Sequence, residues 1–182
     1  MKTSASNCGV IGFKLFNPLI LFRRLCLALV LGTSLFNFSA HAAQLVVGDL
    51  APVIVVKDQF GKELIFTNGV RYLLIAVERA CATSANQQFT VAGGGFLEKH
   101  QACFVMDIHK MPAVARWFAF PKMRKYPHRV GLVDSAAMLQ NFPLQANRVT
   151  VLELGSDRRI RAIKYWDPTK EPAGQLLGIS SD

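Results

Sequence analysis

The sequence has few of the residues and motifs that mark cofactor sites. Its 182 residues include four cysteines, and none of them belongs to a C-x-x-C-H haem-attachment motif. No G-x-G-x-x-G turn is present to direct backbone N–H groups at the pyrophosphate of a flavin or nicotinamide dinucleotide. The one glycine cluster, Gly93-Gly94-Gly95, follows a predicted helix rather than a strand. We therefore expect no cofactor.

Acidic residues are absent from residues 1–42. The basic pair Arg23-Arg24 precedes an apolar run at 25–38, and Ala40-His41-Ala42 follows it. A positive segment, an apolar segment and an A-x-A site are typical of a secretory signal peptide, here cleaved after Ala42 to leave Ala43 as the first mature residue. The apolar run is shorter than the ~20 residues that span a bilayer, so an uncleaved anchor in the inner membrane is the alternative.

Charged residues are also sparse, at 18% against 51% hydrophobic, which excludes a disordered or collagen-like chain. Without residues 1–42 the chain has 140 residues, with 17 Lys and Arg against 12 Asp and Glu. This length suits one periplasmic domain, 43–182. The modest net charge of +5 permits contact with an anionic membrane surface but does not require it. A nucleic-acid partner fits poorly with export.

The first half of this domain is predicted to form a hairpin, a strand and a helix. Two β-prone runs, 53–57 and 62–66, flank an Asp-Gln-Phe-Gly turn and predict a β-hairpin. The continuous apolar run 72–77 predicts a central strand that is buried on both faces. Ser84 and Gln87 have the S-x-x-Q spacing of a capping box, so a helix is expected to begin near residue 85.

The second half alternates strands and helices. It predicts a strand at 102–107, a helix at 112–120 ended by Pro121, and a short strand at 129–133. A hairpin over 149–166 and a last helix near 175–177 complete the order. Such an order indicates an α/β fold with a mixed sheet covered on both faces.

The opening segments 47–52 (Val-Gly-Asp-Leu-Ala-Pro) and 58–62 (Asp-Gln-Phe-Gly-Lys) are similar to the start of the peroxiredoxin-like branch of the thioredoxin superfamily. Met111-Pro112, Phe120-Pro121 and Val149-Thr150-Val151 resemble small exported bacterial proteins of thioredoxin-like pattern, some of which are loosely named FAD/FMN-containing dehydrogenases. The resemblance implies a thioredoxin-like three-layer sandwich with a mixed central sheet and an N-terminal β-hairpin.

In that superfamily the chemistry lies where the central strand meets its helix, which here is the segment 78–84. Cys81 stands in this segment, where a helix N-terminus would favour its thiolate. Ser84 takes the place of the second cysteine of a C-x-x-C pair, so no dithiol is available. Residues 78–80 (Glu-Arg-Ala) replace the Pro and Thr that shape a peroxide pocket, and Val149 stands where related enzymes have a cis-proline. Cys81 and Ser84 remain the candidate catalytic residues.

The other mature cysteine, Cys103, is predicted to lie near the start of the next strand, at the opposite edge of the sheet from Cys81. A bridge needs Cα atoms within roughly 7 Å, so no disulfide is expected. His100-x-x-Cys103 is the tightest metal-ligand pair, and two ligands do not close a zinc site. No metal centre is therefore predicted.

A basic stretch, 116–129, contains interleaved aromatic residues. One interpretation is a surface for an anionic membrane or for an envelope protein, with the aromatic side chains as anchors. The alternative is a helix that buries Met111, Val114, Trp117 and Phe118 while its charges stay in solvent.

Three functions follow from these patterns. The leading hypothesis is an exported thioredoxin-like protein without a C-x-x-C dithiol that serves as a non-catalytic binding or accessory module of the cell envelope. The alternative is a monothiol thiol-disulfide oxidoreductase that uses Cys81. A weaker alternative, suggested by the name of some similar proteins, is a flavin-dependent dehydrogenase.

Overall fold

A computed structural model describes residues 43–66 and 69–177. The predicted signal peptide, including Ala42 on one side of its cleavage site, lies outside the described residues. Among residues 43–66 and 69–177, none of the helices combines the length and the hydropathy that a membrane span requires.

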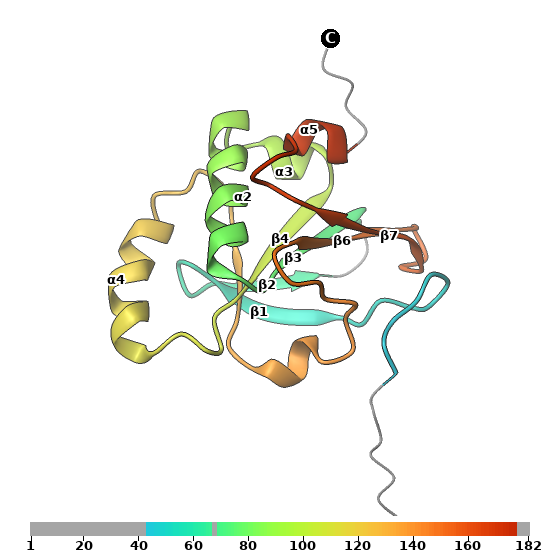
Figure 1. Cartoon of the computed structure of the whole chain (residues 1–182), viewed down its shortest axis with the longest axis horizontal. Coiled ribbons are helices and arrows are strands. Elements are labelled where there is room, and N and C mark those ends of the chain that lie inside the picture. The colour runs from blue at the N-terminus through green and yellow to red at the C-terminus, as the bar shows by residue number, and fades with distance from the viewer. Residues whose placement is uncertain (1–42, 67–68, 178–182) are drawn as a thin grey trace, which may run out of the picture. The chain divides into compact units, whose positions relative to one another are not determined.

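Seven strands form one mixed sheet in the order β2-β1-β5-β4-β3-β6-β7 (Figure 1). The three central strands, β3, β4 and β5, run parallel to one another, and their neighbours β1 and β6 run antiparallel to them. The strands are β1 (Ile54–Asp58), β2 (Glu63–Phe66), β3 (Tyr72–Ala76), β4 (Ala102–Asp107), β5 (Gly131–Val133), β6 (Val149–Leu154) and β7 (Ile160–Trp166). The predicted central strand is confirmed, because β3 lies between β4 and β6 and all of its residues are buried.

Helical segments follow β3, β4, β5 and β7. They are α2 (Arg79–Ala92), α3 (Phe96–Lys99), α4 (Ala113–Met123), the 3₁₀ helix η2 (Ala136–Leu139) and α5 (Ala173–Leu176). Strand residues alternate between two hydrophobic clusters, so that Leu74 and Phe104 face one side of the sheet and Ile75 and Val105 face the other. The first cluster is covered by α2 to α5, and the second by η2 and its flanking segments.

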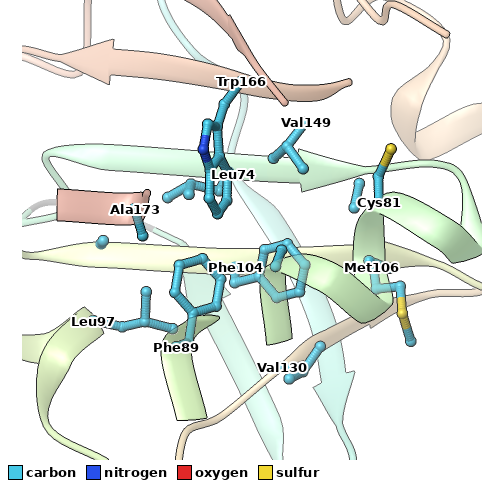
Figure 2. Packing of buried hydrophobic residues seen from close by; sticks show 14 of the residues in the cluster. Leu74, Cys81, Phe89, Leu97, Phe104, Met106, Val130, Val149, Trp166 and Ala173 are labelled. Atoms are coloured by element: carbon cyan, nitrogen blue, oxygen red, sulfur yellow. The ribbon is translucent and has the colours of Figure 1, made fainter. Parts of the chain in front are cut away.

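Aromatic packing fixes the first cluster against the sheet. The ring of Phe89 meets the ring of Phe104 edge-on, with 5.3 Å between centroids, and lies 5.7 Å from the indole of Trp166 (Figure 2). Phe89 and Trp166 are almost completely buried, at 0% and 1% exposed. Offset and edge-on aromatic pairs stabilise more than their buried area alone, so α2 is held firmly over the sheet.

The predicted N-terminal hairpin is confirmed, with β1 and β2 paired from Ile54 and Phe66 inward. Its turn is built on Asp58, whose Oδ1 accepts hydrogen bonds from the backbone N–H groups of Phe60 and Lys62 at 2.9 and 2.8 Å. The other carboxylate oxygen accepts a 2.9 Å hydrogen bond from Nε of Arg129. Burial opposes ionisation, yet these backbone and guanidinium donors together lower the pKa of Asp58.

Two predicted helix boundaries are wrong. Helix α2 begins at Arg79 rather than near residue 85, because Glu78 already has the extended backbone of an N-cap residue and the residues after it suit a helix. Helix α4 continues through Pro121 to Met123. A proline forgoes one backbone hydrogen bond, here the bond to the carbonyl of Trp117, on the exposed side of the helix where that loss costs little.

Candidate functional site

Cys81 is the third residue of α2, in the corner where the central strand β3 passes into this helix. Its side chain is only 4% exposed and belongs to the first hydrophobic cluster, together with Val149 at the start of β6 (Figure 2). The predicted position at the strand–helix corner is therefore correct. The thiol is part of the core rather than a group presented to solvent.

The electrostatic surroundings of Cys81 keep it protonated. Burial raises the pKa of its thiol, and the negative charges of Glu78 and Asp167 raise it further, while Arg148 opposes them. A place in the first helical turn favours a thiolate, but here that effect is outweighed. Burial and these charges therefore act against the activation that the helix N-terminus was expected to give Cys81.

Ser84 does not take the predicted role of helix cap. It lies within the second turn of α2, half-buried, and the helix has already begun five residues earlier. It lies three positions after Cys81 on the same helix, but no hydrogen bond joins the two side chains in the described part of the chain. This geometry therefore gives Ser84 no role in stabilising a Cys81 thiolate.

Cys103 lies on β4 opposite Leu73 of β3, and its side chain packs with the second cluster, on the other face of the sheet from Cys81. Both cysteines are free, in agreement with the predicted absence of a disulfide. Burial raises the pKa of Cys103 to about 11. Its thiol therefore stays protonated at neutral pH and has no geometric access to Cys81.

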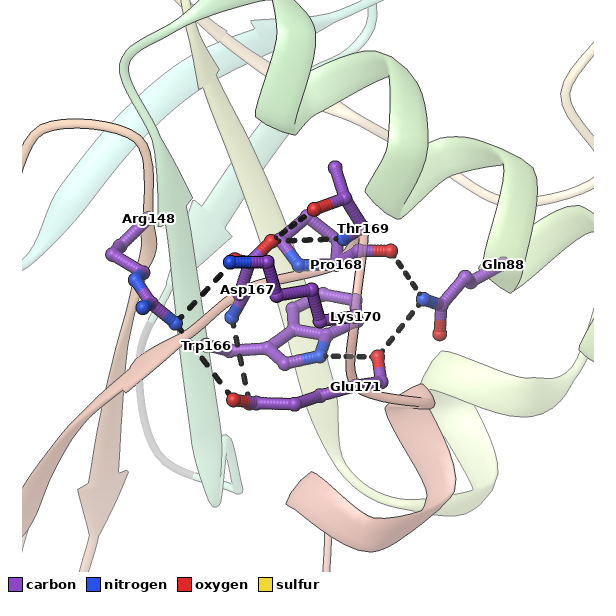
Figure 3. A network of polar contacts seen from close by, with 8 residues as sticks. All are labelled: Gln88, Arg148, Trp166, Asp167, Pro168, Thr169, Lys170 and Glu171. Atoms are coloured by element: carbon purple, nitrogen blue, oxygen red, sulfur yellow. Dashed lines mark hydrogen bonds and ion pairs between the residues drawn. The ribbon is translucent and has the colours of Figure 1, made fainter.

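A polar network that the sequence did not predict ties the C-terminal segment to α2 (Figure 3). The side-chain amide of Gln88 donates to the carbonyls of Pro168 and Glu171 at 2.6 and 2.9 Å, and its Oε1 accepts from the N–H of Ala173 at 2.6 Å. The indole Nε1 of Trp166 also donates to the carbonyl of Glu171, at 2.8 Å. The side chain of Gln88 thus supplies hydrogen-bond partners to backbone groups of this irregular segment.

Asp167 links that network to the strand–helix corner. Hydrogen bonds from the hydroxyl and backbone of Thr169, together with the nearby charges of Arg148 and Lys170, lower the pKa of Asp167. The carboxylate is therefore ionised at neutral pH. Its charge is one of the reasons that the pKa of Cys81 is raised.

A groove between α2 and α4 is the second candidate site. Its volume is about 700 Å³, and it lies beyond the carboxyl ends of the parallel strands β3 and β4. Its lining residues come from both helices, from these strand ends and from the segments before and after α4. They are Val77, Arg79, Thr83, Asn86, Met106, Asp107, Lys110, Met111, Pro112, Ala115, Phe118, Ala119, Lys122, Met123 and Tyr126.

Helix α4 does not bury the residues that the alternative interpretation of the basic stretch 116–129 assigned to the core. Val114, Trp117 and Phe118 are 70%, 73% and 60% exposed, and Met111 is only half-buried. Met123 packs inward instead, with Phe120 partly buried beside it. The guanidinium of Arg116 fixes this rotation, because it donates to the carbonyls of Met111 and Ile108 at 2.9 and 2.8 Å.

The three histidines of the described residues contact different polar partners. His100 Nδ1 contacts the carbonyl of Phe96, and His109 Nδ1 contacts the carboxylate of Asp107. His128 is buried in the core. Within residues 43–66 and 69–177, no three side chains of the metal-binding types come together.

No protein-family model matches the sequence, and no curated protein matches it significantly. Solved structures do match, in 125 chains. A peroxiredoxin-like protein from Aquifex aeolicus is 15% identical, with a TM-score of 0.50 over 76% of this chain and 87% of that one. The fold is thioredoxin-like. This confirms the predicted fold class.

Two further solved structures share this fold. A protein from Chlorobium tepidum, assigned as the thiol:disulfide interchange protein DsbE, is 13% identical with a TM-score of 0.52, over 74% of this chain and 96% of that one. A protein from Bacteroides thetaiotaomicron, assigned as a protein disulfide isomerase, is 13% identical with a TM-score of 0.50, over 74% and 87%. Identities this low establish the thioredoxin-like fold alone.

Proposed function

We propose that this protein is exported to the periplasm and acts there as a non-catalytic binding module of the cell envelope. One observation carries the proposal: the single thiol at the strand–helix corner is 4% exposed with a raised pKa, while the groove on the same helix is open. A thiolate is the nucleophile in disulfide exchange. A thioredoxin-like fold that keeps its thiol protonated and buried is suited to binding rather than to exchange.

Export rests on the composition of residues 1–42, with a basic segment, an apolar run and Ala40-His41-Ala42. The test is to express the 182-residue sequence in a Gram-negative host and to determine the N-terminus of the purified protein by mass spectrometry. We expect Ala43 as the first residue, recovered from the periplasmic fraction. A membrane-bound protein with an intact N-terminus would show instead that the segment is an uncleaved anchor.

The competing hypothesis is a monothiol oxidoreductase. The position of Cys81, at the corner where thiol enzymes of this fold hold their reactive sulfur, favours it. In that reaction the Cys81 thiolate would attack one sulfur of a disulfide, form a mixed disulfide and release the other sulfur as a thiolate. An external thiolate would then attack the substrate sulfur of the mixed disulfide, form a new disulfide with it and release Cys81 as a thiolate.

Incubation of the protein with oxidised glutathione separates the two hypotheses. A binding module should form the Cys81 mixed disulfide more slowly than free cysteine does, as followed by mass spectrometry in a Cys103→Ser background. Cys81→Ser provides the blank. Rapid formation, reversed by added glutathione, would establish the oxidoreductase. A yellow absorbance of the purified protein would instead support the weaker alternative of a flavoprotein.

A further inference from the structure

The groove between α2 and α4 has the dimensions and position of a small-molecule site. Ligand sites in proteins have volumes of roughly 300–1,000 Å³, and this one measures about 700 Å³. It lies beyond the carboxyl ends of β3 and β4, where ligands of open α/β sheets usually bind. Its lining does not include Cys81, although Arg79 and Thr83 of the same strand–helix segment contribute to it.

The walls of the groove are mainly apolar and adaptable. Three methionines, Met106, Met111 and Met123, line it together with the rings of Phe118 and Tyr126. Methionine side chains are unbranched and polarizable, so they adjust to ligands of irregular shape. A surface of this kind suits a flexible hydrocarbon chain better than a rigid polar molecule.

Positive charge lines the same groove. Arg79, Lys110 and Lys122 all contribute to its lining, and none of the three has an ion-pair partner among the residues that the structure describes. The one acidic lining residue, Asp107, is engaged by His109, whose Nδ1 and backbone N lie 2.6 and 2.9 Å from Oδ1. Three cationic side chains and one carboxylate therefore line the groove, which leaves an excess of positive charge beside its apolar walls.

We propose that the groove binds an anionic amphiphile with a single chain, a long-chain carboxylate. Its hydrocarbon chain packs on the methionines and on Phe118, and its carboxylate meets the cations Arg79, Lys110 and Lys122. This inference deepens the proposed binding function, on which it rests, by naming the ligand class. Trp117 and Val114 lie outside the groove lining, so a ligand in the groove does not need them.

The test is isothermal titration calorimetry on the protein produced from the 182-residue sequence, with decanoate, 1-decanol and acetate as probes. Decanoate should bind, 1-decanol should bind about tenfold more weakly because it lacks the charged head, and acetate should show no binding. Comparable affinities for decanoate and 1-decanol would overturn the proposal. So would heat from acetate equal to that from decanoate.

Two matched pairs of variants locate the site. Ala115 lines the groove and Ala113 does not, although both are exposed on α4, so Ala115→Trp should abolish decanoate binding while Ala113→Trp preserves it. Lys122→Gln should weaken binding about tenfold, whereas Lys125→Gln, an exposed position outside the lining, should not. Thermal unfolding of each variant shows that the fold is intact.

Two further results would overturn the groove or the ligand class. Loss of binding in Trp117→Ser, with Ala115→Trp unaffected, would assign the interaction to the exposed face of α4 and overturn the groove. Absence of decanoate binding also overturns the ligand class, yet it leaves the glutathione experiment on Cys81 free to support or reject a non-catalytic role. The two proposals therefore fail in distinguishable ways.

Discussion

The imidazole Nε2 of His128 lies 2.9 Å from the side-chain Oδ1 of Asn86, inside the core beneath α2. The amide nitrogen of Asn86 donates to the carbonyl of Ala82 at 2.8 Å, which leaves Oδ1 as an acceptor. His128 must therefore carry its proton on Nε2. Its Nδ1 has no hydrogen-bond partner within the described residues, and its ring lies against Tyr126 and Phe89.

This arrangement predicts loss of stability in mild acid. Burial lowers the pKa of His128 below its ordinary value of about 6.5, although the charge of Glu98 opposes the shift. As the pH falls below about 6.5 the unfolded chain gains this proton before the folded chain does, so the free energy of unfolding decreases. Thermal unfolding from pH 7 to pH 5 should show a falling Tm.

His128→Gln is the variant that tests the cause. It should have a lower Tm at pH 7, because it disturbs the contacts with Asn86 and the aromatic rings, but a weaker dependence on pH. His100→Gln, which leaves the buried imidazole in place, should keep the original dependence. An unchanged pH dependence in His128→Gln would assign the effect to other groups.

A second prediction concerns the attachment of the C-terminal segment to α2. Gln88→Ala removes three hydrogen bonds to Pro168, Glu171 and Ala173 and should lower the free energy of unfolding by roughly 1–3 kcal/mol. Gln87→Ala, at the exposed neighbouring position, should change it by less than about 0.5 kcal/mol. Urea unfolding measures both, and equal effects would contradict the anchoring role of Gln88.

The two tryptophans supply a third prediction. Trp166 is 1% exposed and Trp117 is 73% exposed. Trp166→Ala should therefore cost about 3–5 kcal/mol of unfolding free energy, and Trp117→Ser about 0.5 kcal/mol or less. A large loss from Trp117→Ser in urea unfolding would mean that α4 is rotated toward the core and that the groove is lined differently.

The strands were the most predictable part of this fold. The continuous apolar run of β3 and the turn at Asp58 depend on local chemistry that the sequence displays directly. The start of α2 was missed because Ser84 and Gln87 have the spacing of a capping box, while the helix begins at Arg79 through the extended backbone of Glu78. The capping-box spacing was a local signal for a helix start near residue 85, and the burial of Cys81 in the tertiary core prevailed over it.

The candidate sites were less predictable, since they depend on how helices are rotated. Helix α4 carries apolar residues around its whole circumference, so its periodicity did not show that Met123 faces inward while Val114 and Trp117 face outward. The groove forms only when α2 and α4 pack beside the same strand ends. Gln88 gave no local signal, because its partners lie some 80 residues away in sequence, as in its 2.6 Å bond to Pro168.

The measurement that tests the central claim most directly is the rate of alkylation of Cys81 as a function of pH. It uses the folded protein with Cys103→Ser, so that one mature thiol reports. The account predicts a slow reaction with a midpoint above the ~8.5 of a free thiol, because burial and the charges of Glu78 and Asp167 raise the pKa of Cys81. Fast alkylation with a midpoint well below that value would contradict it and establish an activated thiolate.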